Sequence, residues 1–198
     1  KEETVLPIKK DDQNAIKVYK SELLINTAQA INNIAVLMSK NRTPESLSEA
    51  ANLFHKAADL GFATSQRNYA FALRNGIGIP KDKEAEIIYL LKSANQGYIE
   101  SLFAVYTYFF EVDDPRSIRY LRTSAFKTYP PGLHMYGYAI EHGVGLSNDK
   151  AINFFWAGAQ NHYPFCLNNY ATRITDINLS NKLWKEAAEK GLKHAQYN

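Results

Sequence analysis

Apolar and small residues recur along the chain at helical spacing, within a unit that repeats about every 33 residues. The clearest part of the unit is a pair of large apolar residues, followed by two small residues and then by a glycine. This pattern occupies Leu53–Gly61, Tyr89–Gly97 and Leu183–Gly191, and two copies that lack the glycine end at Thr128 and His162. The five end positions lie 29 to 36 residues apart, which is typical of helix-turn-helix repeats.

The residues after each end position repeat as well. The fourth is small, the eighth and ninth include a large apolar or aromatic side chain, and the twelfth is large and apolar. These positions share one stripe of a helix, so each unit should be two amphipathic helices of about 12–14 residues that need their neighbours for stability. The small residues are Ser65, Ser101, Gly132, Cys166 and Ala195, and a sixth copy with Ala30, Ile34, Ala35 and Met38 follows if Asn26 is an end position.

The sequence therefore predicts an all-α solenoid of about five to six helix-turn-helix repeats. We expect a flexible tail over residues 1–12 and a single solenoid over residues 13–198. The predicted units are 27–61, 62–97, 98–128, 129–162 and 163–191, with a partial unit at 192–198.

Two loops, Asn75–Asp82 and His142–Asp149, read G-x-G-apolar-x-x-D and follow an apolar helical pattern. A phosphate cradle would follow a strand and carry a Lys-Ser/Thr pair, so we interpret these loops as helix ends. The glycines suit left-handed helix ends, and an aspartate or threonine before a helix can cap it. The predicted left-handed ends are Gly76 and Gly143, and the predicted caps are Asp82, Asp149, Thr43 before Pro44, and Asp114 before Pro115.

Taken as a set, the small-x-x-x-aromatic-Ala stretch, the G-x-G-apolar-x-x-D loop and the Ala-Ala-x-x-Gly helix end resemble the Sel-one-like repeat family, a relative of the tetratricopeptide repeats. The resemblance covers about residues 27–198. It implies a right-handed α/α superhelix that binds other proteins. The loops at 111–114 and 175–178 depart from the pattern because they are short and lack G-x-G.

Composition limits the partners and ligands that the protein is expected to bind. The 23 basic and 20 acidic side chains give a net charge of +3 without a clustered basic stripe, so we expect no nucleic-acid partner. No run of eighteen apolar residues exists, so we expect no membrane insertion. The five histidines lack metal-ligand spacing and Cys166 is the only cysteine, so we expect no metal, cofactor or disulfide. Cys166 holds a small packing position, and we interpret it as an inert buried thiol.

Part of each first helix should face away from the repeat core, at the third, sixth, tenth and thirteenth positions. In the superhelices that the chain resembles, this face lines the concave groove. One slot on this face is aromatic in three successive units, at Phe71, Phe103 and Tyr138. These rings are either binding anchors or packing contacts with neighbouring helices. The predicted partner-binding residues are Asn32, Arg67, Phe71, Arg74, Phe103, Phe110, His134, Tyr138, Glu141 and Asn168.

We therefore expect a non-enzymatic scaffold that binds a protein in this groove, with no catalytic residue. Two alternatives stay open: a hydrolase of cell-wall or β-lactam substrates, an activity associated with the cysteine-rich branch of the family, and a purely structural repeat array of a larger protein. Rich use of Asn, Ile, Lys and Tyr suggests a bacterial source. Bacterial members of the family are often exported, for host interaction, envelope regulation or toxin neutralisation, so a periplasmic or secreted location is favoured over a cytoplasmic one. A first residue other than Met fits a removed leader and a cut within a longer chain equally.

Overall fold

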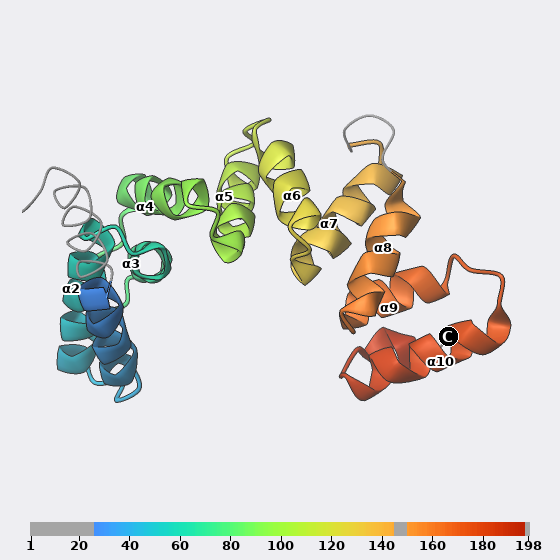
Figure 1. Cartoon of the computed structure of the whole chain (residues 1–198), viewed down its shortest axis with the longest axis horizontal. Coiled ribbons are helices and arrows are strands. Elements are labelled where there is room, and N and C mark those ends of the chain that lie inside the picture. Colours follow the sequence, from blue (N-terminus) through green and yellow to red (C-terminus); the bar gives the residue numbers. More distant parts are fainter. Residues whose placement is uncertain (1–25, 145–149, 197–198) are drawn as a thin grey trace, which may run out of the picture. The chain divides into compact units, whose positions relative to one another are not determined.

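The computed structural model describes residues 26–144 and 150–196, which are helical with no strand in either range (Figure 1). This confirms the all-α prediction. The chain forms two compact units that divide between Gln96 and Gly97. We call the described residues before this point the N-terminal unit and those after it the C-terminal unit. The predicted tail at 1–12 lies outside the described residues, and the single solenoid stays a prediction.

The N-terminal unit begins with helix over residues 26–39, followed by α2 (Pro44–Asp59), α3 (Ala63–Asn75) and α4 (Lys83–Asn95). Helix α3 packs against both α2 and α4. The predicted cap at Thr43 is confirmed, because its hydroxyl accepts from the Ser46 amide at 3.2 Å while the Ser46 hydroxyl accepts from the Thr43 amide at 3.1 Å. Pro44 takes the first helical position, where its missing N–H costs no hydrogen bond.

Small side chains fill the interior of the N-terminal unit. Its described buried apolar residues are mostly alanines, joined by Phe54, Leu73 and Leu90. Alanine leaves little volume between helices, so the backbones approach closely and bury area without large rings. The alanines are Ala28, Ala35, Ala50, Ala51, Ala57, Ala58, Ala70, Ala72 and Ala94.

The first G-x-G loop ends α3 and seats the chain against α2. Gly76 has φ 71°, as predicted for a left-handed helix end. Gly78 has φ 72° and lies so close to α2 that a Cβ there would sit 2.2 Å from the Leu47 carbonyl oxygen. Asp82 then caps α4 by accepting from the Ala85 amide at 2.9 Å. The second glycine therefore serves a close backbone approach as well as a turn.

The C-terminal unit contains six α-helices and a final turn in its described residues. Each helix packs against the next, and α7 also contacts α9. The cap predicted at Asp149 lies outside the described residues, whereas Gly143 has φ 73° as expected. The elements are α5 (Ile99–Glu111), α6 (Ser117–Phe126), α7 (Pro130–Glu141), α8 (Ala151–Gln160), α9 (Pro164–Ala171), α10 (Ile177–Glu189) and the 3-10 turn η1 (Lys193–Gln196).

Aromatic rings fill the interior of the C-terminal unit. Tyr136 and Phe155 are fully buried, and the ring of Phe154 meets that of Tyr136 edge-on at 4.9 Å. Glycine makes room for these rings, because a Cβ at Gly137 would lie 2.7 Å from the Phe155 ring. Large side chains thus pack against positions that carry no side chain at all.

Cys166 belongs to the same interior. It is fully buried and forms no disulfide, and burial raises its thiol pKa to about 12. A Cβ added at Gly158 would lie 2.2 Å from its sulfur. The prediction of a buried thiol in a small packing position is confirmed.

The repeat frame is visible in the backbone at the helix ends. Gly61 and Gly191 have φ of 93° and 91°, and the two copies without glycine adopt the same left-handed region, with φ 61° at Thr128 and 54° at His162. Residues with a Cβ rarely adopt this conformation. Their presence at these two positions confirms the frame read from the sequence.

Two details of the frame were wrong. Helix α6 begins at Ser117, and Asp114 instead accepts from the Arg116 amide at 2.8 Å, so Asp114-Pro115 does not start the helix. In the sixth copy, Ala30 and Ile34 are exposed, because the stripe Ala28, Asn32 and Ala35 faces inward. That copy has no Ala-Ala-x-x-Gly segment before it, so the sequence did not specify which residue is its end position.

Candidate protein-binding sites

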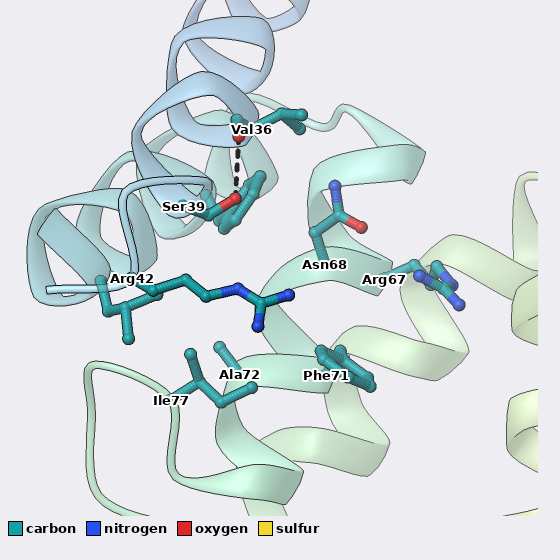
Figure 2. Close-up of a pocket in the computed structure, with 10 residues that line it drawn as sticks. Val36, Ser39, Arg42, Arg67, Asn68, Phe71, Ala72 and Ile77 are labelled. Carbon is teal, nitrogen blue, oxygen red and sulfur yellow. Dashed lines mark hydrogen bonds between the residues drawn. The ribbon is translucent and has the colours of Figure 1, made fainter.

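The N-terminal unit carries a pocket of about 520 Å³ between the first helix, α2 and α3 (Figure 2). We call it the N-terminal pocket. It includes two of the predicted binding residues, Arg67 and Phe71, and Phe71 is 53% exposed. The described residues that line it are Val36, Ser39, Arg42, Leu47, Phe54, Arg67, Asn68, Phe71, Ala72 and Ile77.

Apolar side chains from four elements form most of this lining, with Val36 coming from the first helix. Leu47 and Phe54 come from α2, Ala72 from α3, and Ile77 from the G-x-G loop. Arg42 extends from the turn before α2 across the pocket toward α3, and Arg67 lies at the opposite side of the view (Figure 2). The pocket therefore combines an apolar surface with two guanidinium groups.

Neither guanidinium has a carboxylate partner within residues 26–144 and 150–196. Arg42 and Arg67 form no ion pair with any residue there, and no described lining residue is Asp or Glu. Arg42 is exposed and Arg67 is half-buried. Among the residues that the structure describes, neither charge is neutralised by a carboxylate.

Two other predicted residues of this unit stabilise the fold instead of lining the pocket. Asn32 is only 5% exposed, and its side-chain oxygen accepts from Ser65 Oγ at 2.9 Å and from Asn68 Nδ2 at 3.1 Å. Arg74 lies 3.4 Å from Glu86, a carboxylate that is 2% exposed. A buried polar group has to be paired, so these contacts fasten the first helix to α3 and α3 to α4.

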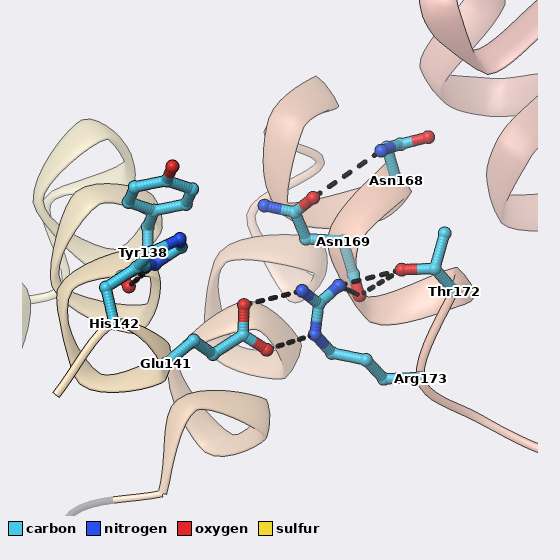
Figure 3. Close-up of polar contacts among 7 residues, drawn as sticks. All are labelled: Tyr138, Glu141, His142, Asn168, Asn169, Thr172 and Arg173. Carbon is cyan, nitrogen blue, oxygen red and sulfur yellow. Dashed lines mark hydrogen bonds and ion pairs between the residues drawn. The ribbon is translucent and has the colours of Figure 1, made fainter.

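The C-terminal unit carries a smaller pocket of about 180 Å³, which we call the C-terminal pocket. Two predicted residues lie together there: Phe110 at the end of α5 is 66% exposed and Tyr138 on α7 is 49% exposed. Tyr138 stacks on His142 with ring centres 4.0 Å apart, and His142 Nδ1 lies 2.9 Å from the Tyr138 carbonyl oxygen (Figure 3). Most of the remaining lining is apolar, so the pocket offers hydrophobic contact rather than charge.

Glu141 lies beside Tyr138 but its charge is already paired. Arg173 donates to both carboxylate oxygens of Glu141, with Nη2 at 2.6 Å from Oε2 (Figure 3). Arg173 also donates to the Asn169 carbonyl at 2.6 Å and lies over the Phe155 ring at 4.7 Å. A two-pronged pair of this kind fixes geometry, so Glu141 joins α7 to the segment after α9.

Phe103, His134 and Asn168 are half-buried. Phe103 packs against the aromatic interior, with its ring 5.3 Å from that of Tyr106. The His134 ring lies 5.1 Å from that of Phe165, and burial lowers the His134 pKa. The slot shared by Phe71, Phe103 and Tyr138 is therefore exposed in α3 and α7 but covered in α5.

Sequence reasoning missed Arg42 and Ser39 as pocket residues and did not place Ile77 among the binding residues. The prediction followed only one face of the first helix of each unit, whereas Arg42 and Ile77 come from turns. The turn positions themselves carried a signal, since Ile77 sits inside the G-x-G loop. Within the described ranges, no group of three or more His, Cys, Asp or Glu could hold a metal ion, and no helix is long and apolar enough to cross a membrane.

The fold and the pockets define a helical repeat protein with exposed aromatic side chains on α3 and α7. The Sel1 repeat matches residues 28–62, 63–98, 130–156 and 171–192, which together exceed half of the chain. The protein belongs to the Sel1 repeat family, as the sequence pattern indicated. Repeats of this family are generally non-catalytic scaffolds with a fold suited to protein–protein interaction. No curated protein matches the sequence.

Solved structures show the same fold. A Sel1 repeat protein from Oxalobacter formigenes is 19% identical with a TM-score of 0.76, and the match covers 85% of this chain and 75% of that one. A protective antigen of uropathogenic Escherichia coli strains, which displays an SLR fold, is 19% identical with a TM-score of 0.74 over 86% of this chain, which spans 40% of that protein's length. The immunity protein PA5088 from Pseudomonas aeruginosa is 18% identical with a TM-score of 0.59, covering 86% of this chain and 67% of that one.

Proposed function

We propose that this protein is a non-enzymatic scaffold that binds a protein partner through exposed aromatic side chains on α3 and α7. The observation that carries the proposal is the exposure of Phe71 and Tyr138, which hold the same slot of the repeat and each border a pocket. A large ring that faces water contributes little to the stability of the fold, whereas aromatic side chains are frequent anchors of interfaces.

The pockets support binding better than catalysis. The N-terminal pocket combines apolar walls with two arginines, and the C-terminal pocket is mostly apolar. The lone thiol, Cys166, is buried with a raised pKa, so it is mainly protonated at neutral pH and a poor nucleophile. Toxin neutralisation is one form that this role could take, and the name of the similar immunity protein supports it as a candidate.

Affinity capture from the source organism tests the proposal. Wild-type protein, Phe71→Ala and Tyr138→Ala are compared as bait, with Phe126→Ala as the control. Phe126 is an exposed ring on α6 that lines neither pocket. We expect a partner that is retained by wild type and by Phe126→Ala, with affinity reduced by about 1–3 kcal/mol in the other two variants.

Thermal melting of the same variants separates binding from folding. Phe71, Tyr138 and Phe126 are each about half exposed, so loss of one ring should lower the free energy of unfolding by about 1 kcal/mol or less. A protein set retained equally by all four baits would overturn the anchor assignment. The absence of any specifically retained protein would overturn the scaffold function.

A further inference from the structure

We propose that the N-terminal pocket binds a partner segment in which an acidic side chain lies close to a large apolar one. The inference rests on the proposed scaffold function and specifies the chemistry of its partner. It is carried by the juxtaposition of Arg42 and Arg67 with the apolar surface of Leu47, Phe71 and Ile77.

The two arginines are suited to a carboxylate. A guanidinium binds a carboxylate through two parallel hydrogen bonds, and such charge-assisted bonds are stronger than neutral ones. Elsewhere in the described part of the chain, Arg74, Arg116 and Arg173 already hold carboxylates of this protein. Arg42 and Arg67 lack such a partner there, although they line the N-terminal pocket.

The structure also fixes the backbone segments that carry both arginines. Arg42 sits in a left-handed turn with φ 55°, directly before the Thr43–Ser46 cap of α2. Arg67 belongs to the first half of α3, next to Asn68, which hydrogen-bonds to Asn32 of the first helix. These contacts fix the pocket walls before a ligand arrives, which lowers the entropy cost of binding.

The apolar surface decides which kind of anion fits. Phe71 is half exposed beside Arg67, and an apolar side chain of the partner would cover it. A nucleic acid also supplies anions, but binding it requires a stripe of basic residues, whereas the described residues that line this pocket include two. The favoured ligand is therefore a peptide segment, and single-stranded DNA is the contrary outcome in the test.

The experiment selects ligands from a phage-displayed library of random twelve-residue peptides on the folded chain. We expect the selected peptides to carry Asp or Glu within a few positions of an aromatic or aliphatic residue. One selected peptide is then synthesised with a fluorophore, and its affinity is measured by anisotropy. Binding should weaken as the salt concentration rises, because the salt screens the charge pairs.

Reversing the charge of each arginine tests whether the peptide binds in the N-terminal pocket. Arg42→Glu and Arg67→Glu should each weaken binding of the peptide by at least about fivefold, the loss that marks an energetically important interface residue. Arg119→Glu is the control, since Arg119 is exposed on α6 of the C-terminal unit and the change in net charge is the same. A peptide with Lys in place of its acidic residues should bind the Arg42→Glu and Arg67→Glu variants better than it binds wild type. Circular dichroism and melting confirm that each variant is folded.

Three outcomes would overturn the inference: selected peptides without acidic residues, affinities unchanged by both reversals, or a DNA oligonucleotide bound with the same arginine dependence. A library that yields no peptide also overturns it. If affinity capture still retains a partner in those cases, only this inference fails. If capture fails as well, the scaffold function fails with it.

Discussion

The two units fill their interiors with side chains of different size. The interior of the N-terminal unit is mostly alanine, as at Ala57 and Ala58, whereas the C-terminal unit packs rings such as Phe155 against glycines such as Gly137. Both solutions fill space densely, because a small pair and a large residue facing an absent side chain occupy similar volumes. The repeat pattern thus determines which positions are buried. The side chains of neighbouring helices can differ in size there, provided that together they fill the space between the helices.

This difference predicts opposite sensitivities. The C-terminal unit should lose most stability when atoms are removed from a buried ring. The N-terminal unit should lose most stability when atoms are added to a small buried residue. Because repeat units contact mainly their neighbours, the two effects should stay local, and hydrogen exchange can read each unit separately.

The largest expected effect is that of Phe155→Ala. Phe155 is fully buried among Tyr106, Tyr136 and Cys166, so truncation should cost about 3–5 kcal/mol of the free energy of unfolding. Denaturant unfolding measures the loss, and amide exchange should accelerate in α7, α8 and α9 before it does in α2 and α3. A loss below about 1 kcal/mol, comparable to that of the exposed Phe126→Ala, would contradict an interior built on rings.

Gly78→Ala should be the next largest. The added Cβ would meet the Leu47 carbonyl at 2.2 Å and would force a residue with a side chain into φ 72°, for a total cost of about 2–4 kcal/mol. Gly61→Ala is the matched control. This variant should lose only the about 1–2 kcal/mol that a residue with a Cβ costs in the left-handed region, since a Cβ at Gly61 would meet nothing within 4 Å. Equal losses of thermal stability in the two variants would show that the contact with Leu47 is unimportant.

Ala57→Leu tests the alanine interior of the N-terminal unit. Ala57 is fully buried, and three extra carbon atoms have no space, so we expect a cost of about 1–3 kcal/mol. Ala30→Leu adds the same atoms at an exposed position of the first helix and should be nearly neutral. If both variants melt like the wild type, the N-terminal unit contains unfilled space and the contrast between the units is wrong.

Much of this architecture could be predicted from the sequence. The Ala-Ala-x-x-Gly segments and the recurring small residues gave the helix frame, and Thr128 and His162 fell at the expected left-handed ends. The first helix was misread at Asn32, because its burial depends on Ser65 and Asn68, more than thirty residues away. Periodicity within a helix contains no information about such pairing.

The candidate site was less predictable for a similar reason. Phe71, Phe103 and Tyr138 hold one slot, yet only Phe103 is covered, by the rings of Tyr106 and Tyr129. Arg42 reaches its pocket from a turn, outside the helical face that the pattern describes. Side chains that come from turns depend on local backbone geometry, which hydrophobic spacing does not specify.

The smallest expected effect is that of Thr128→Gly. This variant tests the helix end of a repeat copy that lacks the terminal glycine. Thr128 is exposed and has φ 61°, a region that costs residues with a Cβ about 1–2 kcal/mol. Glycine removes this strain, but the greater conformational freedom of the unfolded chain costs roughly 0.4–1 kcal/mol, so the variant should gain between about 0 and 1.6 kcal/mol. Lys127→Gly is the control, because Lys127 is exposed at φ −87° and should lose stability from the entropy term without any relief. Denaturant melts that rank Lys127→Gly above Thr128→Gly would mean that the backbone at Thr128 is not strained, and that the repeat tolerates an ordinary residue there without cost.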